Sequence, residues 1–147
     1  MDWLRDALTI STDPTRIDRA LVHAFLSDSY WASGIPREIV DRSIENALCF
    51  GVYEEQRQVG FARVISDFAT FAYLADVFIL PSHRGRGLAK WLMEAILAHP
   101  WLQGLRRWML ATRDAHGLYR QAGFTDLVHP ERMMEIARPE IYRKPGT

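Results

Sequence analysis

The stretch VFILPSHRGRGLAKWLMEAILA, residues 77–98, constrains the fold of this chain more than any other. An apolar run of the kind that forms a strand ends at Pro81, and a loop with alternating arginines and glycines follows. Apolar residues then recur at helical spacing, at Leu88, Trp91 and Leu92. The pattern predicts a strand, a glycine-rich loop and a helix in direct succession.

This loop has the features of an anion site. The first turn of a helix carries backbone N–H groups without partners and a partial positive charge. Arg84 and Arg86 add two full charges, and Gly85 and Gly87 lack the Cβ that would keep a ligand from the backbone. We expect the loop to bind an anion, most naturally a phosphate. The alternative is a solvated turn in which the glycines only satisfy backbone angles.

The two main nucleotide motifs do not fit the loop. The dinucleotide fingerprint G-x-G-x-x-G requires a third glycine where Lys90 stands. The nucleotide-triphosphate loop G-x-x-x-x-G-K-[ST] is absent. The phosphate ligand must therefore belong to another class.

The rest of the chain alternates helical and strand-like segments. Asp13 and Pro14 have the residue types of a helix start, and a second helix is expected from Pro36. The segments FTDLV and RMMEIA, residues 124–128 and 132–137, are expected to be the last two strands. The element order β-α-α-β-β-β-α-β-α-β-β predicts an α/β domain with a mixed sheet. We expect a single domain over residues 1–147, with 138–147 as a loose tail.

Composition excludes several classes of protein. Of 147 residues, 48% are hydrophobic, and 18 basic residues balance 18 acidic ones, which argues against a nucleic-acid binder. No apolar run is long enough to cross a membrane, and no signal-peptide pattern is present. The single cysteine, Cys49, lies among apolar residues, so we expect a buried inert thiol and a cytoplasmic protein. The five histidines lack metal-site spacing, so no metal is expected.

Two motifs resemble the signatures of the GNAT acyltransferase superfamily, as in its small single-domain bacterial-type members. RGRGLA matches R/Q-x-x-G-x-G/A, with Arg84, Gly87 and Ala89 at the defining positions. Downstream, LATRDAHGLYRQAGF is similar to N-x-x-A-x-x-L-Y-x-x-x-G-F, although Thr112 stands where asparagine is frequent. The matching residues are Ala115, Leu118, Tyr119, Gly123 and Phe124. The two motifs occur in order and in the expected context of strand and helix.

The resemblance implies a mixed, mostly antiparallel sheet of about six or seven strands flanked by about four helices. It also implies acetyl-CoA as acyl donor and a small-molecule or peptide amine as acceptor, with no nucleic acid or membrane partner. Dimers are frequent in the family, so a homodimer is one expectation. Contacts to acetyl-CoA are expected from the strand and the loop, at Phe78, Ile79, Arg84, Gly85, Arg86, Gly87, Leu88, Ala89 and Lys90.

The catalytic candidates follow from the same resemblance. Tyr119 occupies the position near the cofactor sulfur, and a neutral phenol could protonate the departing thiolate. Asp76 is a candidate general base, and the alternative is a carboxylate that holds an arginine or the backbone. Tyr73 is expected to line the cleft, and Tyr30 and Trp31 to border the acceptor by cation–π attraction or to pack in the core.

Lesser candidates and rival functions remain open at this stage. His83 and His116 flank the two motifs, and each could act as a base, although solvated side chains are commoner at such positions. The leading function is an acyl-CoA-dependent N-acetyltransferase in which the amine attacks the thioester directly. The backbone near Ile79 would stabilise the oxyanion, as the family implies. The rivals are a non-catalytic CoA-binding or regulatory module and an RNA-binding domain, and the apolar helix and zero net charge argue against RNA.

Overall fold

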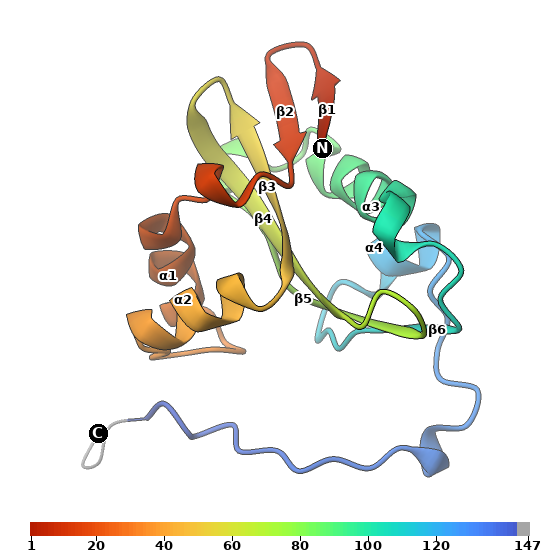
Figure 1. Ribbon diagram of the computed structural model, residues 1–147. Helices are drawn as coiled ribbons and strands as arrows, with labels where there is room; N and C mark the ends of the chain where they lie inside the picture. The colour runs from red at the N-terminus through yellow and green to blue at the C-terminus, as the bar shows by residue number, and fades with distance from the viewer. Residues whose placement is uncertain (144–147) are drawn as a thin grey trace.

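The computed structural model describes residues 1–143 and contains one six-stranded sheet in the order β1 to β6 (Figure 1). All neighbouring strands are antiparallel except β5 and β6, which are parallel. The strands are β1 Asp2–Arg5, β2 Leu8–Ser11, β3 Leu48–Glu54, β4 Arg57–Ser66, β5 Phe71–Ile79 and β6 Arg107–Met109. The prediction of a mixed, mostly antiparallel sheet is confirmed.

Helices cover both faces of the sheet, as Figure 1 shows. The helices are α1 Arg19–Ser27, α2 Arg37–Glu45, α3 Leu88–Ala98 and α4 His116–Gln121. Two apolar clusters result, because the two helix pairs lie on opposite faces. Val22 and Val40 pack with Phe61 in one cluster, and Leu92 and Phe50 belong to the other. None of the helices among the described residues is long and apolar enough to cross a bilayer.

The first helix begins later than expected. Asp13 does cap a helical turn, because its carboxylate accepts a hydrogen bond from the Thr15 N–H at 2.9 Å, but the turn is a short 3₁₀ segment, Pro14–Arg16. α1 starts at Arg19, where the Asp18 carboxylate accepts from the Leu21 N–H at 3.0 Å. Two capping carboxylates therefore divide one predicted helix into two elements. The second helix begins, as expected, directly after Pro36.

The ends of the chain differ from the predicted element order. The N-terminus forms the β1–β2 hairpin in place of one strand. The segments 124–128 and 132–137 are not strands, since no described residue pairs with them in the sheet. Residues 138–143 contain two successive turns, with Tyr142 partly buried, and residues 144–147 of the expected loose tail lie outside the described residues. The assignment of a single domain stays a prediction.

Two irregularities of β5 position the functional site. β5 pairs with β6 only from Phe71↔Arg107 to Tyr73↔Met109, and beyond this point the two parallel segments diverge. On its other side β5 contains a bulge, because Asp76 and Val77 oppose the single residue Ala62 of β4. The divergence opens the sheet beside β5, and the bulge changes which side chains face the opening.

Candidate functional site

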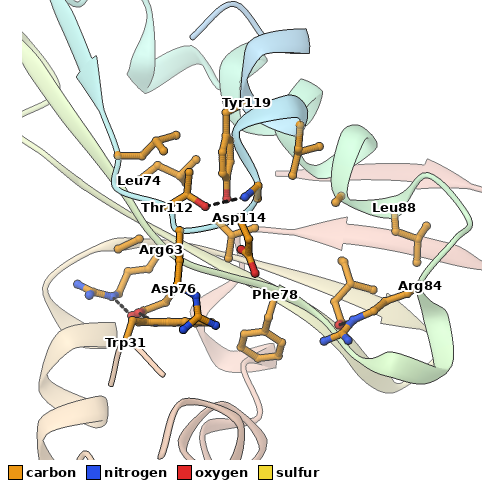
Figure 2. A pocket seen from close by; sticks show the side chains of 18 of the residues that line it. Trp31, Arg63, Leu74, Asp76, Phe78, Arg84, Leu88, Thr112, Asp114 and Tyr119 are labelled. Atoms are coloured by element: carbon orange, nitrogen blue, oxygen red, sulfur yellow. Dashed lines mark hydrogen bonds and ion pairs between the residues drawn. The ribbon is translucent and has the colours of Figure 1, made fainter. Parts of the chain in front are cut away.

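A cleft of about 1020 Å³ lies where β5 and the segment after β6 diverge. Residues from five regions line the cleft: the α1–α2 segment, β4, β5, the loop that leads into α3, and the segment from β6 into α4. Figure 2 shows side chains from these regions pointing into one space. Of the residues predicted to be catalytic or to bind acetyl-CoA or the acceptor, all line the cleft except Arg86 and the lesser candidate His116.

The glycine loop has the backbone that its sequence predicts. Gly85 and Gly87 adopt left-handed conformations with φ of 79° and 74°, and Gly87 is the N-cap of α3. A Cβ built at either glycine would meet no described atom within 4 Å, so the space beside the loop is open. The unpartnered N–H groups of the first turn of α3 therefore remain accessible to an anion.

The two arginines of the loop have different partners. The Arg84 Nε donates a hydrogen bond to the Ile79 carbonyl at 3.0 Å and so ties the loop to the end of β5, while the side chain lines the cleft. The Arg86 guanidinium lies 3.6 Å from the Glu54 carboxylate at the end of β3, and Arg86 is not among the lining residues. The sequence suggested that both arginines face the anion. Only Arg84 lines the cleft, so the structure supports this idea for Arg84 alone. Lys90 is a further cation in the lining.

Asp76 lies in the bulge, at a left-handed φ of 56°, with its side chain in the cleft. One carboxylate oxygen accepts a hydrogen bond from the Trp31 indole N–H at 2.9 Å, and the other accepts from the Arg63 Nε at 2.8 Å. The ion pair is largely shielded, since the Arg63 and Asp76 side chains are 17% and 10% exposed. This arrangement matches the structural alternative considered from sequence, a carboxylate that holds an arginine. A role as base stays a prediction.

The segment between α1 and α2 supplies an aromatic wall. Tyr30 and Trp31 meet edge to face, with ring centroids 5.1 Å apart, and both remain substantially exposed. Arg113 closes the wall from the opposite side, because its guanidinium carbon lies 3.7 Å from the centre of the Tyr30 ring. The Arg113 backbone N–H also donates to the Tyr30 hydroxyl at 3.3 Å. These two aromatic residues therefore belong to the cleft and not to the core.

Tyr119 presents its ring and hydroxyl from α4 (Figure 2). The ring is 9% exposed and packs edge to face against Phe124. Burial raises the pKa of the Tyr119 phenol, and the nearby Tyr30 and Asp114 raise it further. The phenol therefore keeps its proton at neutral pH. Its hydroxyl makes no hydrogen bond to any residue in the described part of the chain, which leaves it available to a ligand.

The start of α4 is held by Thr112. Asp114 has the residue type of a cap, but Ala115 is the N-cap, and the Thr112 hydroxyl accepts a hydrogen bond from the Ala115 N–H at 3.1 Å. The helix ends just before Gly123, which has a left-handed φ of 104°. Thr112, the departure from the family motif, therefore has a local role in holding the start of the helix that carries Tyr119.

The histidine and cysteine candidates differ in burial and in their position relative to the cleft. His83 is buried rather than solvated, with its Nδ1 2.7 Å from the Ser82 hydroxyl and its Nε2 3.4 Å from the Glu54 carboxylate. His116 is exposed and lies outside the cleft lining. Cys49 is buried, and burial raises the pKa of its thiol to about 12. Within residues 1–143, no group of three possible metal ligands occurs.

Two functional candidates were not found from the sequence. Arg63 stands alone among apolar residues in GFARVIS, and a charge on an otherwise buried strand was a signal that a carboxylate partner must face it. Arg113 lies four residues after the end of β6 and gave no such signal, because its partner Tyr30 lies 83 positions away in the sequence. Both side chains contact a residue that the sequence did predict.

Comparisons with known proteins agree on one family. The model of the acetyltransferase (GNAT) domain matches residues 45–126. A proposed acetyltransferase of Gibberella zeae is 34% identical over 141 residues, which cover 80% of this chain and 78% of that protein. A crystal structure of a proposed GNAT-family acetyltransferase from Xanthomonas campestris is 55% identical, covers 93% of this chain and 97% of its own, and has a TM-score of 0.91. A Clostridium acetobutylicum structure described as an acetyltransferase with acetyl-CoA is 14% identical and has a TM-score of 0.66. The match covers 88% of this chain and 96% of that one. At this low identity the similarity supports the fold alone.

Proposed function

The chain belongs to the GNAT acetyltransferase family, and from this membership we propose that it transfers the acetyl group of acetyl-CoA to a primary amine. Acetyl-CoA is here a substrate, the acyl donor, and no metal takes part in the proposal. One observation carries it: a single cleft brings together the open glycine loop at the start of α3, the diverging edge of β5 and a protonated Tyr119.

The loop has the properties that a diphosphate requires. Gly85 and Gly87 leave open space beside the backbone, and the first N–H groups of α3 have no partner within the helix. Arg84 and Lys90 add positive charge to the same lining. We propose that the diphosphate of the donor binds here and that its pantetheine arm follows β5 past Phe78 and Ile79, which also line the cleft.

The proposed reaction is a direct transfer. The nitrogen of the acceptor attacks the thioester carbonyl carbon, a C–N bond forms and the C–S bond breaks, so that the sulfur leaves with the electron pair. Tyr119 would give its phenolic proton to that sulfur, a role that its raised pKa and ligand-accessible hydroxyl support. The acylated nitrogen then loses its extra proton, which restores the phenol of Tyr119 directly or through solvent, so the products are the amide and the free CoA thiol. Cys49 takes no part, because it is buried outside the cleft lining with its thiol protonated.

The acceptor enters from the side of the aromatic wall in this proposal. Tyr30 and Trp31 can hold a cationic amine by cation–π attraction, and Tyr73 lines the same space. The amine must lose a proton before it attacks. Asp76 is the proposed base, but both of its oxygens already accept hydrogen bonds, so the carboxylate also fixes Trp31 in the wall.

The test combines turnover with binding. The protein and acetyl-CoA are incubated with each member of a panel of amines, and the release of free thiol is measured. The panel includes polyamines, amino acids, amino sugars and peptides with free N-termini. Calorimetric titration with CoA is run in parallel. We expect CoA to bind and thiol release to depend on at least one class of amine. If CoA binds but no amine in the panel promotes thiol release, the chain is a CoA-binding module and the proposed transfer is wrong.

A further inference from the structure

Arg113 and Asp114 bring two opposite charges into the cleft, in the segment that leads from β6 into α4. Within residues 1–143, the Arg113 guanidinium forms no ion pair and no hydrogen bond. The Asp114 carboxylate likewise accepts no hydrogen bond from a described residue, and it does not pair with its neighbour Arg113. Both charges are therefore available to a ligand.

The other charges in the cleft lining already have a place. Asp76 and Arg63 form an ion pair at 2.8 Å, so their charges cancel. Arg84 and Lys90 lie at the glycine loop, where the diphosphate of the donor is proposed to bind, and the buried His83 belongs to the same loop. At the acceptor end of the cleft, the described side chains therefore leave one positive and one negative charge unmatched.

Arg113 is held in place by the aromatic wall. Its guanidinium carbon lies 3.7 Å from the centre of the Tyr30 ring, and its backbone N–H donates to the Tyr30 hydroxyl at 3.3 Å. A guanidinium stacked in this way is covered on the face turned to the ring, while its N–H donors point outward in its own plane. These donors are the groups that bind a carboxylate in a bidentate pair. Arg113 therefore offers an ordered anion site.

The same contact limits what Tyr30 can bind. The ring face beneath Arg113 is occupied, so that face cannot hold the ammonium of an acceptor by cation–π attraction. Trp31 remains 43% exposed in the same wall, with its indole N–H bonded to Asp76. The wall therefore combines an aromatic surface with a positive end, and this combination suits an acceptor that carries an anionic group as well as an amine.

Asp114 places the opposite charge near the proposed acid. Figure 2 shows its side chain pointing into the cleft. Burial raises the pKa of the Tyr119 phenol, and the negative charge of Asp114 contributes to that rise, so the two groups interact. A carboxylate here would attract the ammonium of an acceptor toward the C–S bond that breaks. Because Arg113 and Asp114 are consecutive, with Cα atoms about 3.8 Å apart, the two complementary charges fit within one small molecule.

We propose that the acceptor is an amino acid, a small molecule with a primary amine and one carboxylate. This inference rests on the proposed acetyl transfer and names its substrate class. The carboxylate would bind Arg113, and the ammonium would meet Asp114 and, once deprotonated, attack the thioester. Overall the amine gains the acetyl group, CoA leaves as the thiol and one proton passes to solvent. A phosphate fits less well, because a dianion would meet a single unpaired cation and the repulsion of Asp114.

The first test compares acceptors that differ only in the anionic group. Amino acids with different spacings between amine and carboxylate are each compared with the corresponding amide, in which a neutral group of similar size replaces the carboxylate. The kcat/KM for each acceptor is measured from thiol release at saturating acetyl-CoA. We expect the best amino acid to exceed its own amide by about 10-fold to 100-fold, the usual range for a charge-assisted pair.

Arg113→Gln assigns that preference to one side chain. The variant should lower kcat/KM for the amino acid by about 10-fold to 100-fold and leave the amide within about threefold of the wild type. Arg113→Lys should restore part of the preference, since it returns the charge without the planar fork. Arg106→Gln is the matched control: Arg106 is exposed and outside the cleft lining, so the variant removes the same charge and should change neither acceptor.

Calorimetric titration separates the acceptor site from the transfer. The protein is saturated with CoA, which has no acetyl group to give, and each amino acid is added up to about 10 mM, ten times the upper end of the usual KM range. We expect saturable binding that Arg113→Gln weakens by about tenfold or more. The affinity for CoA itself should not change, because Arg113 lies at the acceptor end.

The outcomes distinguish this inference from the acetyl transfer. Transfer to amines without a preference for the carboxylate overturns the amino-acid assignment and leaves the transfer intact, and so does a preference for amino phosphates or for peptides. A loss of CoA affinity in Arg113→Gln also overturns it, because Arg113 would then belong to the donor site. Binding of an amino acid that depends on Arg113, without turnover of any amine, supports the site and refutes the transfer. Absence of both binding and turnover refutes both.

Discussion

Replacing Tyr119 by phenylalanine isolates one hydroxyl in the proposed mechanism. The ring is 9% exposed and contacts Phe124, and phenylalanine keeps that packing. The hydroxyl makes no hydrogen bond to any residue from 1 to 143, so its removal leaves no described polar group without a partner. We therefore expect the variant to fold as the wild type does and to keep most of its affinity for CoA.

The effect on turnover should be large. Loss of a general acid typically costs 10²-fold or more in rate, which corresponds to about 2.7 kcal/mol of transition-state stabilisation. The loss should fall on kcat, because the proton is needed only as the C–S bond breaks. Because the pKa of the Tyr119 phenol is raised, the wild-type enzyme should keep its proton donor through neutral and mildly alkaline pH and lose activity only when the pH rises through that raised value.

The assay is steady-state thiol release with an acceptor from the amine panel, with a melting curve and a CoA titration for each variant. Tyr53→Phe is the matched control, since Tyr53 is a buried tyrosine outside the cleft lining whose hydroxyl has no hydrogen-bond partner among the described residues. If kcat of Tyr119→Phe stays within about threefold of the wild type while chemistry limits the rate, the phenol is a packing residue and the sulfur must receive its proton elsewhere.

Three further predictions test the rest of the site. Gly87→Asp should lower CoA affinity by about 100-fold or more in a titration, because it adds a side chain at a φ of 74° and a negative charge beside the proposed diphosphate; unchanged affinity in a folded variant would remove the loop from the site. Asp76→Asn should keep an acceptor for Trp31 but weaken the ion pair with Arg63; a fall in kcat with an altered acid limb of the pH profile supports the base, whereas a rise in KM for the amine alone supports positioning. Cys49 should react with a thiol reagent at pH 8 only after unfolding, because burial raises its pKa to about 12, and rapid reaction in the folded protein would contradict its burial.

The central part of the chain was predictable because local chemistry decides its structure. Gly85 and Gly87 are needed for left-handed backbone, and the apolar stripe from Leu88 dictates the helix that follows. The same local rules failed where two signals competed. Asp13 and Asp18 are both good caps, and each caps its own helical turn. The second is held by Gln58, whose side-chain oxygen accepts a hydrogen bond from the Asp18 N–H at 2.7 Å across 40 positions.

The remaining differences arise from contacts that no local pattern contains. Residues 132–137 have the sequence of a strand, yet strand formation requires an edge, and the chain directs this segment away from β6. The pairing of Arg113 with Tyr30 depends on where two loops meet once the sheet has opened. The sequence could indicate that Tyr30 and Trp31 are unusual loop residues, but not which cation they would contact.

The bulge at Asp76 links the opening of the sheet to the acceptor wall. An aspartate at a φ of 56° carries a backbone cost of about 1 kcal/mol that glycine would avoid. Glycine, however, would offer no carboxylate to the Trp31 indole and the Arg63 guanidinium, which lie 2.9 Å and 2.8 Å from the two oxygens. Because two residues of β5 oppose one of β4 here, the strand also changes which of its side chains face the cleft. The bulge therefore changes the direction of β5 beside the proposed path of the donor. Through the Asp76 carboxylate it also holds Trp31 in the loop that would bind the amine. One backbone irregularity thus positions both halves of the cleft.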